Sequence, residues 1–126
     1  MAKDNLYLGK KGEEEAHNWL RKEGYKVLAR NYKTRLGEID IIAKDKDTVC
    51  FIEVKARGSD RFGLPQEAVS RAKQDRIARV AMGFLKENNL LTQEARFDIV
   101  SVIYSKSSCE LELIKNAFEL DRRFAY

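Results

Sequence analysis

The sequence has few of the residues and segments that would divide, anchor or cross-link a chain. Pro65 is the only proline, the 7 glycines are scattered, and no Ser/Gly/Pro-rich linker or internal repeat interrupts the 126 residues. No apolar run approaches the roughly 20 residues of a membrane span, and the N-terminus lacks the apolar core of a signal peptide. We therefore expect a single domain over residues 1–126, located in the cytoplasm and not in a membrane.

Cysteine and histidine are scarce too, which argues against several kinds of site. Cys50 and Cys109 are far apart and form no metal-type pair, so neither a disulfide framework nor a thiolate zinc site is indicated. The single histidine, His17, borders an apolar stripe and has no triad partners. The net charge of +4 and the pI of about 9.1 are compatible with nucleic-acid binding but do not by themselves indicate it.

What the chain does contain is enough apolar sequence for a packed core, at 44% hydrophobic and 35% charged residues. Helical periodicity predicts one helix over Lys11–Glu23, ended by Gly24, and a long helix from near Pro65 to about Asn88. Strands are expected over residues 25–31, 38–44, 48–56, 96–105 and 109–115. The order αβββαββ predicts an antiparallel meander of three strands, a crossover helix and two further strands. The tail, residues 116–126, shows no clear period and is expected to be loosely ordered.

Four ionisable side chains interrupt the most hydrophobic part of the sequence, "GEIDIIAKDKDTVCFIEVKAR" at residues 37–57. Residues two apart on a strand face the same side, so Glu38 and Asp40 share a face, and so do Glu53 and Lys55. If the strands pair around the central turn, three carboxylates and one ammonium converge. A surface ladder of ion pairs explains Glu53 and Lys55 equally well. That alternative explains Asp40 less well, because aspartate is a poor strand former.

The position of Glu13 favours a functional site over a surface ladder of ion pairs. It lies on the same stripe of the first helix as Leu20, at the end where the helix meets the sheet. A favourable position in the helix dipole is the alternative, and it is the better interpretation for Glu14 and Glu15. Clustered carboxylates need a cation, and oxygen ligands without His or Cys indicate Mg²⁺ or Mn²⁺. With Lys55 placed to stabilise negative charge or activate water, these residues suggest phosphodiester hydrolysis.

Several ordered blocks of the sequence resemble a known family. "GEIDIIA" followed by "FIEVKAR" resembles the Asp…Glu-x-Lys signature of the PD-(D/E)xK nuclease superfamily. The blocks "GKKGEEEA", "RNYKTRLGEIDIIA", "FIEVKAR", "QEAVSRAK" and "RFDIV", in this order, resemble the YraN-like family more closely. Those are uncharacterised bacterial proteins, predicted to be endonucleases and grouped with archaeal Holliday-junction resolvases. The resemblance implies an α/β fold with a restriction-endonuclease-like αβββαβ core, a small mixed sheet flanked by helices, and an extra C-terminal strand.

The resemblance also implies roles for individual residues. Asp40 matches the metal-binding aspartate, and Glu53 and Lys55 match the acidic and basic members of Glu-x-Lys. Glu13 matches a helix-borne glutamate that resolvase-like members add to the metal site. Ile39 stands where the superfamily's name has proline, a departure that leaves the expected metal ligands Asp40, Glu53 and Glu13 in place.

Further residues are expected beside this site. Gln66 and Lys73 resemble auxiliary polar residues that some members place next to the metal, although a helix first turn and a solvated face also explain them. Basic residues near the site are candidates for phosphate contacts, with ordinary solubilising charge as the alternative. They are Arg57, Arg61, Lys73, Arg35 and Lys11. No element resembles a base-reading recognition helix, so structure-specific or weakly specific binding is expected.

Three functional hypotheses follow. The first is a Mg²⁺- or Mn²⁺-dependent endonuclease acting on branched, Holliday-junction-like or otherwise distorted DNA, for which the resemblance implies a homodimer. The second is a non-catalytic nucleic-acid-binding module on a nuclease-like fold. The third is an interaction protein whose aromatic tail, Phe118–Tyr126, docks on a partner. Glu38 is left open between a member of the site and a flanking residue.

Overall fold

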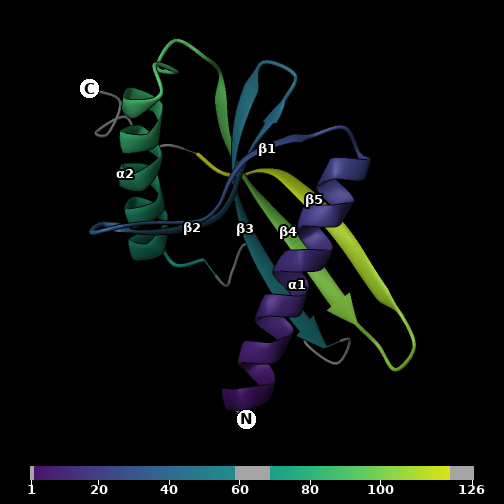
Figure 1. Cartoon of the computed structure of the whole chain (residues 1–126). Coiled ribbons are helices and arrows are strands. Elements are labelled where there is room, and N and C mark those ends of the chain that lie inside the picture. Colours follow the sequence, from purple (N-terminus) through teal and green to yellow (C-terminus); the bar gives the residue numbers. More distant parts are fainter. Residues whose placement is uncertain (1, 59–68, 120–126) are drawn as a thin grey trace.

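The computed structural model describes residues 2–58 and 69–119, with side chains from Gly9 onward, and shows an α/β fold with two helices and one sheet (Figure 1). The element order αβββαββ confirms the sequence-based prediction. The elements are α1 (Ala2–Lys22), β1 (Lys26–Thr34), β2 (Gly37–Asp45), β3 (Thr48–Gly58), α2 (Arg71–Glu87), β4 (Ala95–Tyr104) and β5 (Cys109–Phe118). Neither of these helices has a stretch both long and apolar enough to cross a membrane.

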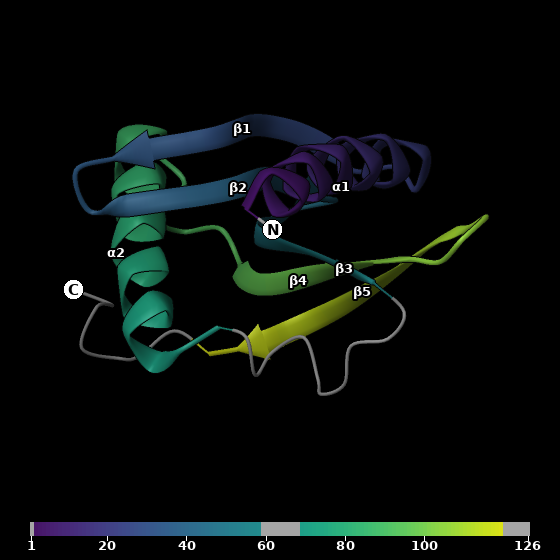
Figure 2. The ribbon, with the colours of Figure 1, turned by 90° about the horizontal axis from the view of Figure 1, so that it is seen from below.

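The five strands form one mixed sheet in the order β1-β2-β3-β4-β5. The pairs β1–β2, β2–β3 and β4–β5 are antiparallel, and β3–β4 is parallel. Parallel neighbours need a crossover connection, and α2 supplies it. The predicted meander and the predicted crossover are thus both confirmed. Figure 2 shows α2 crossing the strands at one end of the sheet while α1 runs along them.

The helices cover opposite faces, because alternating residues of the central strands pack under different helices. Ile42 and Phe51, which are register partners, belong to the buried cluster that contains the inner face of α2. Ile41 and Ile52 belong to the cluster that contains Leu20 of α1. Each cluster removes a row of large apolar side chains from water, which is the main contribution to the stability of the domain.

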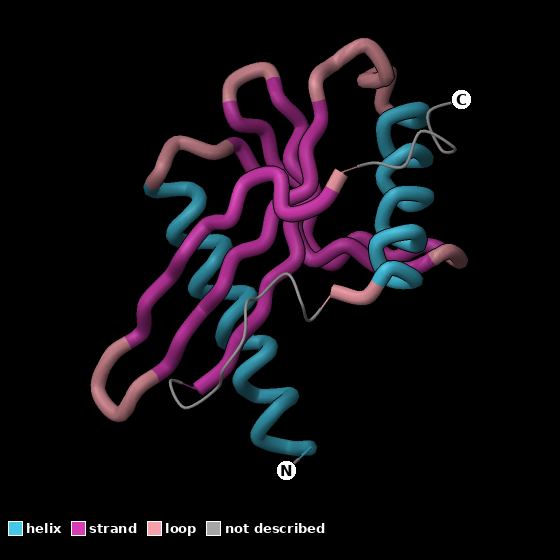
Figure 3. The backbone as a smooth tube through the Cα atoms, turned by 180° about the vertical axis from the view of Figure 1, so that it is seen from behind, coloured by secondary structure: helices cyan, strands magenta, loops and turns pink. Residues whose placement is uncertain are grey.

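The sheet forks in its middle. The pairing of β2 with β3 runs only from Asp45–Thr48 to Ile41–Ile52. Beyond that point, the first residues of β2 pair with β1 alone, and the last residues of β3 pair with β4 alone. Figure 3 shows the β1–β2 hairpin diverging from β3, β4 and β5. The twist of β2 is strong enough that Ile39 packs under α2 although Ile41 packs under α1.

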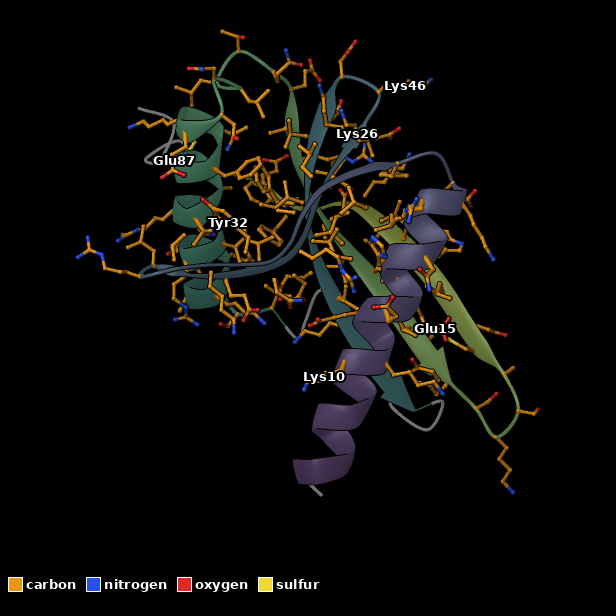
Figure 4. All side chains as sticks on the ribbon, in the orientation of Figure 1. Lys10, Glu15, Lys26, Tyr32, Lys46 and Glu87 are labelled. Atoms are coloured by element: carbon orange, nitrogen blue, oxygen red, sulfur yellow. The ribbon has the colours of Figure 1, made fainter. Side chains whose placement is uncertain are left out.

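The diverging hairpin is fastened to α2. The ring of Tyr32 meets that of Phe84 edge-on, with 5.3 Å between centroids, and its hydroxyl donates to Glu87 at 3.2 Å. Figure 4 shows Tyr32 and Glu87 side by side. The hairpin is therefore a fixed arm that lies against the helix.

Two predicted boundaries were wrong at the N-terminal side of the sheet. Helix α1 begins at Ala2 rather than at Lys11, since helix-forming residues outside the apolar stripe extend it. Strand β1 continues to Thr34 instead of ending near Asn31. Asn31 adopts φ +49° within the strand, a conformation that asparagine tolerates better than most residues. The expected stop at Gly24 is confirmed by its φ of +93°.

Two further boundaries differ later in the chain. The described part of the second helix begins at Arg71, because Ser70 caps it by accepting the Lys73 backbone N–H at 3.2 Å. The expected start near Pro65 lies outside the described residues. Strand β5 extends to Phe118, whose ring stacks on Phe97 at 4.9 Å, so the tail is part of the sheet up to that residue.

At the other end of the sheet, a network of charged side chains links several elements. The sequence pattern does not predict it. Arg96 donates through Nε to Asp98 at 2.8 Å and through Nη2 to Tyr25 at 2.9 Å and Asp45 at 3.1 Å. Asp98, which is 0% exposed, also accepts the backbone N–H of Asn116 at 3.0 Å. The network links β2, β4, β5 and the connection between α1 and β1, where the strands stay paired.

Removing one partner of this network leaves the other charge buried and uncompensated. We expect Asp98→Ala to lower the free energy of unfolding by about 3–5 kcal/mol, measured by urea denaturation followed by circular dichroism. Glu110→Ala, at an exposed carboxylate on β5, is the control and should change it by less than about 0.5 kcal/mol. A loss below about 1 kcal/mol for Asp98→Ala would show that the network is not a main support of the sheet.

Candidate functional site

Asp40 lies at the point where the sheet forks. Its Oδ2 accepts the backbone N–H of Val54 at 2.8 Å, so the side chain takes over a donor that lies beyond the last β2–β3 pair. A buried backbone N–H needs such a partner, and a carboxylate is a strong one. Glu53, next to Val54, is only 4% exposed. The fork thus brings Asp40 and Glu53 together without a ladder hydrogen bond between their strands.

An open pocket of about 140 Å³ lies here, between the β1–β2 hairpin and the first turns of α2. That volume has room for a few waters or a hydrated cation. Its lining residues come from β2, β3 and α2. They are Gly37, Glu38, Asp40, Glu53, Lys73, Arg76 and Ile77.

Glu13 reaches this site from α1 because the helix packs very close to β3. A Cβ atom on Gly12 would lie 2.7 Å from the Cβ of Ala56, so only glycine permits this approach. The carboxyl group of Glu13 then lies close enough to Asp40 for the charge of Asp40 to act on it. Burial, followed by the negative charges of Asp40 and Glu38, raises the pKa of Glu13. The predicted meeting of Glu13 with Asp40 is present, and Glu38 acts on both through its charge.

Two lysines face the carboxylates. Lys73 Nζ lies 2.9 Å from Glu53 Oε2, and the side chains of Lys55 and Lys73 are within hydrogen-bonding reach of each other. Burial, and then the positive charge of Lys73, lowers the pKa of Lys55. Burial is the largest single influence on the pKa of Lys73 and lowers it, but the hydrogen bond and charge of Glu53, together with the charge of Asp40, raise the pKa overall. Lys55 is therefore the lysine that gives up its proton more readily.

The surroundings of Asp40 disfavour the charged form of its carboxyl group. Burial, followed by the charge of Glu53, raises the pKa of Asp40 from 3.8 to about 6. The Val54 N–H and Lys73 oppose this shift only in part. We refer to Glu13, Asp40 and Glu53 as the acidic cluster.

The acidic cluster supplies only carboxylate oxygens, which suit a hard divalent cation in kind. In the described part of the chain, however, no three His, Cys, Asp or Glu side chains are arranged to hold a metal ion as they stand. Glu53 is paired with Lys73 instead. The chemistry of the donor set therefore suits a hard cation, whereas its present arrangement does not hold one.

The other predicted contact residues lie at varying distance from the cluster. Arg57 follows Lys55 by two residues on β3, and Arg35 is exposed in the turn between β1 and β2. Lys11 is turned elsewhere, because its Nζ lies over the Tyr104 ring at 5.2 Å from the centroid. The structure therefore places Arg57 on the strand that carries Lys55 and Arg35 in the hairpin turn, and it directs the Lys11 ammonium group to Tyr104.

Gln66 and Arg61 lie outside the described residues. Arg76, not singled out above, lines the pocket beside Lys73. The sequence does contain a signal for Arg76: it follows Lys73 by three residues, and this spacing places the two side chains on one face of the helix. Figure 4 shows Lys10 pointing from α1 toward the side on which α2 lies.

Comparison with known proteins gives a consistent match over most of the chain. Residues 12–102 match the model of the "Uncharacterised protein family UPF0102". A "UPF0102 protein" of Syntrophus aciditrophicus is 50% identical over 116 residues, which cover 92% of this chain and 91% of the relative. Those of Desulfosudis oleivorans and Geobacter metallireducens are 47% and 44% identical, over 94% and 95% of this chain and 95% and 98% of the relatives.

The raised pKa of Asp40 predicts a dependence of stability on pH. Because the folded-state pKa lies above the unfolded value of 3.8, this group stabilises the fold at acidic pH, and the contribution is lost as pH rises from about 4 to about 6. Asp40→Asn removes the charge but keeps an acceptor for Val54. We expect it to stabilise the metal-free protein by about 1–3 kcal/mol at pH 7.5, and much less at pH 4.

Thermal unfolding at both pH values, in EDTA, measures this difference. Glu110→Gln, an exposed carboxylate, should leave Tm unchanged at both. A Tm at pH 7.5 that is equal to or below that of the wild type would contradict the assignment of Asp40 as a destabilising, half-buried charge.

Proposed function

This chain belongs to the uncharacterised protein family UPF0102, and from its site we propose that it is a metal-dependent endonuclease that hydrolyses phosphodiester bonds in DNA. The observation that carries the proposal is the convergence of the acidic cluster with Lys55 and Lys73 at the fork of the sheet. The residues come from both helices and from both arms of the fork. A set of this composition, with a carboxyl pKa raised to about 6, is typical of a catalytic site.

Glu13, Asp40 and Glu53 would hold Mg²⁺ or Mn²⁺, which when bound stabilises charge on a phosphate and lowers the pKa of a water. Lys55 has the second role. Because burial and Lys73 lower its pKa, it can accept a proton from the attacking water. In its protonated form it can donate to a phosphate oxygen as negative charge develops there.

The surroundings of the pocket suit a polyanionic substrate. Arg35, Arg57 and Arg76 lie on the hairpin, on β3 and on α2, three elements that border the site. Positive charge on several sides favours phosphate contacts that are independent of sequence. Branched or Holliday-junction-like DNA is the proposed substrate class, on the basis of the resemblance to resolvases. A cytoplasmic homodimer would present two sites for two strands.

A non-catalytic DNA-binding module is the second candidate. The observation that favours it is the ion pair of Glu53 with Lys73, which uses a carboxylate that a metal would need. On this alternative, the lysine is a permanent counter-ion and the basic surface does the binding.

Cleavage of fluorescent junction, flap and linear DNA in Mg²⁺ or Mn²⁺ tests the endonuclease. We expect Asp40→Ala and Lys55→Met each to reduce the rate by about 10²–10⁴, since the first removes a metal ligand and the second removes the group that acts on the attacking water or the phosphate. Glu110→Gln is the control for preparation and folding. Equal rates for wild type and Asp40→Ala would refute the catalytic role, and binding in Ca²⁺ without cleavage in either metal would favour the binding module.

The ion pair between Lys73 and Glu53 leads to a separate prediction about metal affinity. Lys73→Met frees Glu53 and removes a positive charge, so we expect Mn²⁺ to bind about 5- to 20-fold more tightly, measured by isothermal titration calorimetry. Arg76→Met removes a charge from the same pocket without freeing Glu53 and should have a smaller effect. Equal effects of the two variants, or weaker binding by Lys73→Met, would show that the ion pair does not compete with the metal.

A further inference from the structure

The turn between β1 and β2 carries an unusual side chain for its position. Leu36 is 49% exposed, and among the described residues only Leu91, at 52%, is another large hydrophobic side chain with such exposure. A single exposed leucine is ordinary on a protein surface. This one stands at the end of an arm that borders the candidate site. We call residues 33–37 the hairpin tip.

The hairpin tip is held in place. The backbone N–H of Leu36 donates to Thr34 Oγ1 at 3.0 Å, which closes the turn locally. Gly37 lies against α2: a Cβ on it would be 3.6 Å from Arg76 Cβ and from Val80 Cγ2. Leu36 therefore projects from a supported turn, and little conformational entropy remains to be lost when it contacts a partner.

The hairpin tip is also part of the rim of the site. Gly37 and Glu38, which follow Leu36 directly, line the same pocket as Asp40. Lys33, near the end of β1, and Arg35, in the turn, are both exposed and both precede Leu36. An apolar side chain that follows two exposed cations, at the edge of the proposed site, fits a nucleic acid with an accessible base stack.

We propose that the hairpin tip is a wedge that places Leu36 against an open base step of branched DNA, with Lys33 and Arg35 on the adjacent phosphates. Apolar side chains that enter a base stack must separate two bases, which costs a few kcal/mol in a continuous duplex. At a branch point the stack is already interrupted, so the cost is smaller. Leu36 would therefore make the protein select branched over linear DNA. This inference rests on the proposed function for the identity of the ligand.

Binding without turnover tests the wedge separately from catalysis. Fluorescence anisotropy in Ca²⁺ gives Kd values for a four-way junction and for a linear duplex of the same length and sequence. We expect the wild type to bind the junction more tightly than the duplex. In Leu36→Ser, the ratio of the two Kd values should fall by about 5- to 20-fold, while the Kd for the duplex stays the same. Leu91→Ser, of equal exposure but in the turn after α2, is the matched control and should keep the preference.

Two further measurements sharpen the result. A 2-aminopurine at the branch should brighten on binding of the wild type and less with Leu36→Ser, because the base loses its stacking neighbour. Arg35→Gln should weaken binding to both DNAs alike, since a phosphate contact carries no structural preference. Thermal unfolding checks that the variants are folded.

The outcomes separate the two proposals. A junction preference retained by Leu36→Ser, or absent from the wild type, overturns the wedge even if metal-dependent cleavage is found. A Leu36-dependent preference in a protein that cleaves no DNA supports the wedge and refutes the endonuclease.

Discussion

The hydrogen bond from the Val54 N–H to the Asp40 carboxylate is the interaction on which the rest of the site depends. It satisfies a backbone donor just beyond the point where β2 and β3 stop pairing, and so it allows the sheet to open there. A closed sheet would keep the layers of α1 and α2 apart. The fork lets Glu13 from one helix and Lys73 from the other reach the same pair of strands. One side chain thus maintains the opening and stands in the site that the opening creates.

Two aspartates, the buried Asp98 and the half-buried Asp40, show how differently the protein treats the same side chain. Asp98 has Arg96 on both oxygens and a backbone N–H from β5, so its charge is fully compensated. Asp40 has one backbone N–H and carboxylates for neighbours, and its pKa rises to about 6. The first arrangement supports the paired end of the sheet. The second leaves a poorly compensated acid at the open end, a kind of unfavourable charge that is found more often at functional sites than elsewhere.

Much of the fold and part of the site could be predicted from local pattern. Period-two alternation was enough for the hairpin and for the proximity of Asp40 and Glu53, and the spacing of Glu13 on its helix stripe indicated the third acid. The strong twist of β2, which turns Ile39 toward α2, depends on tertiary packing and has no local signal. The Arg96–Asp98 network was missed although two charges alternate on that strand much as Glu53 and Lys55 do. Its partners come from distant elements, so the pattern alone could not distinguish a buried network from a catalytic pair.

The parallel pairing of β3 with β4 has a consequence for the order in which the protein is made. Beyond Ile52, the only described strand that pairs with β3 is β4, whose residues follow the whole of α2 in the chain. While the ribosome is still synthesising α2, the growing chain already contains α1 and the first three strands. The arm of β3 with Glu53 and Lys55 then has an unpaired edge, since such long-range strand pairs form late. The strand that completes the pairing of this arm, β4 (Ala95–Tyr104), is made well after the last acid, so a nascent chain contains Glu13, Asp40 and Glu53 before the sheet around them can be complete.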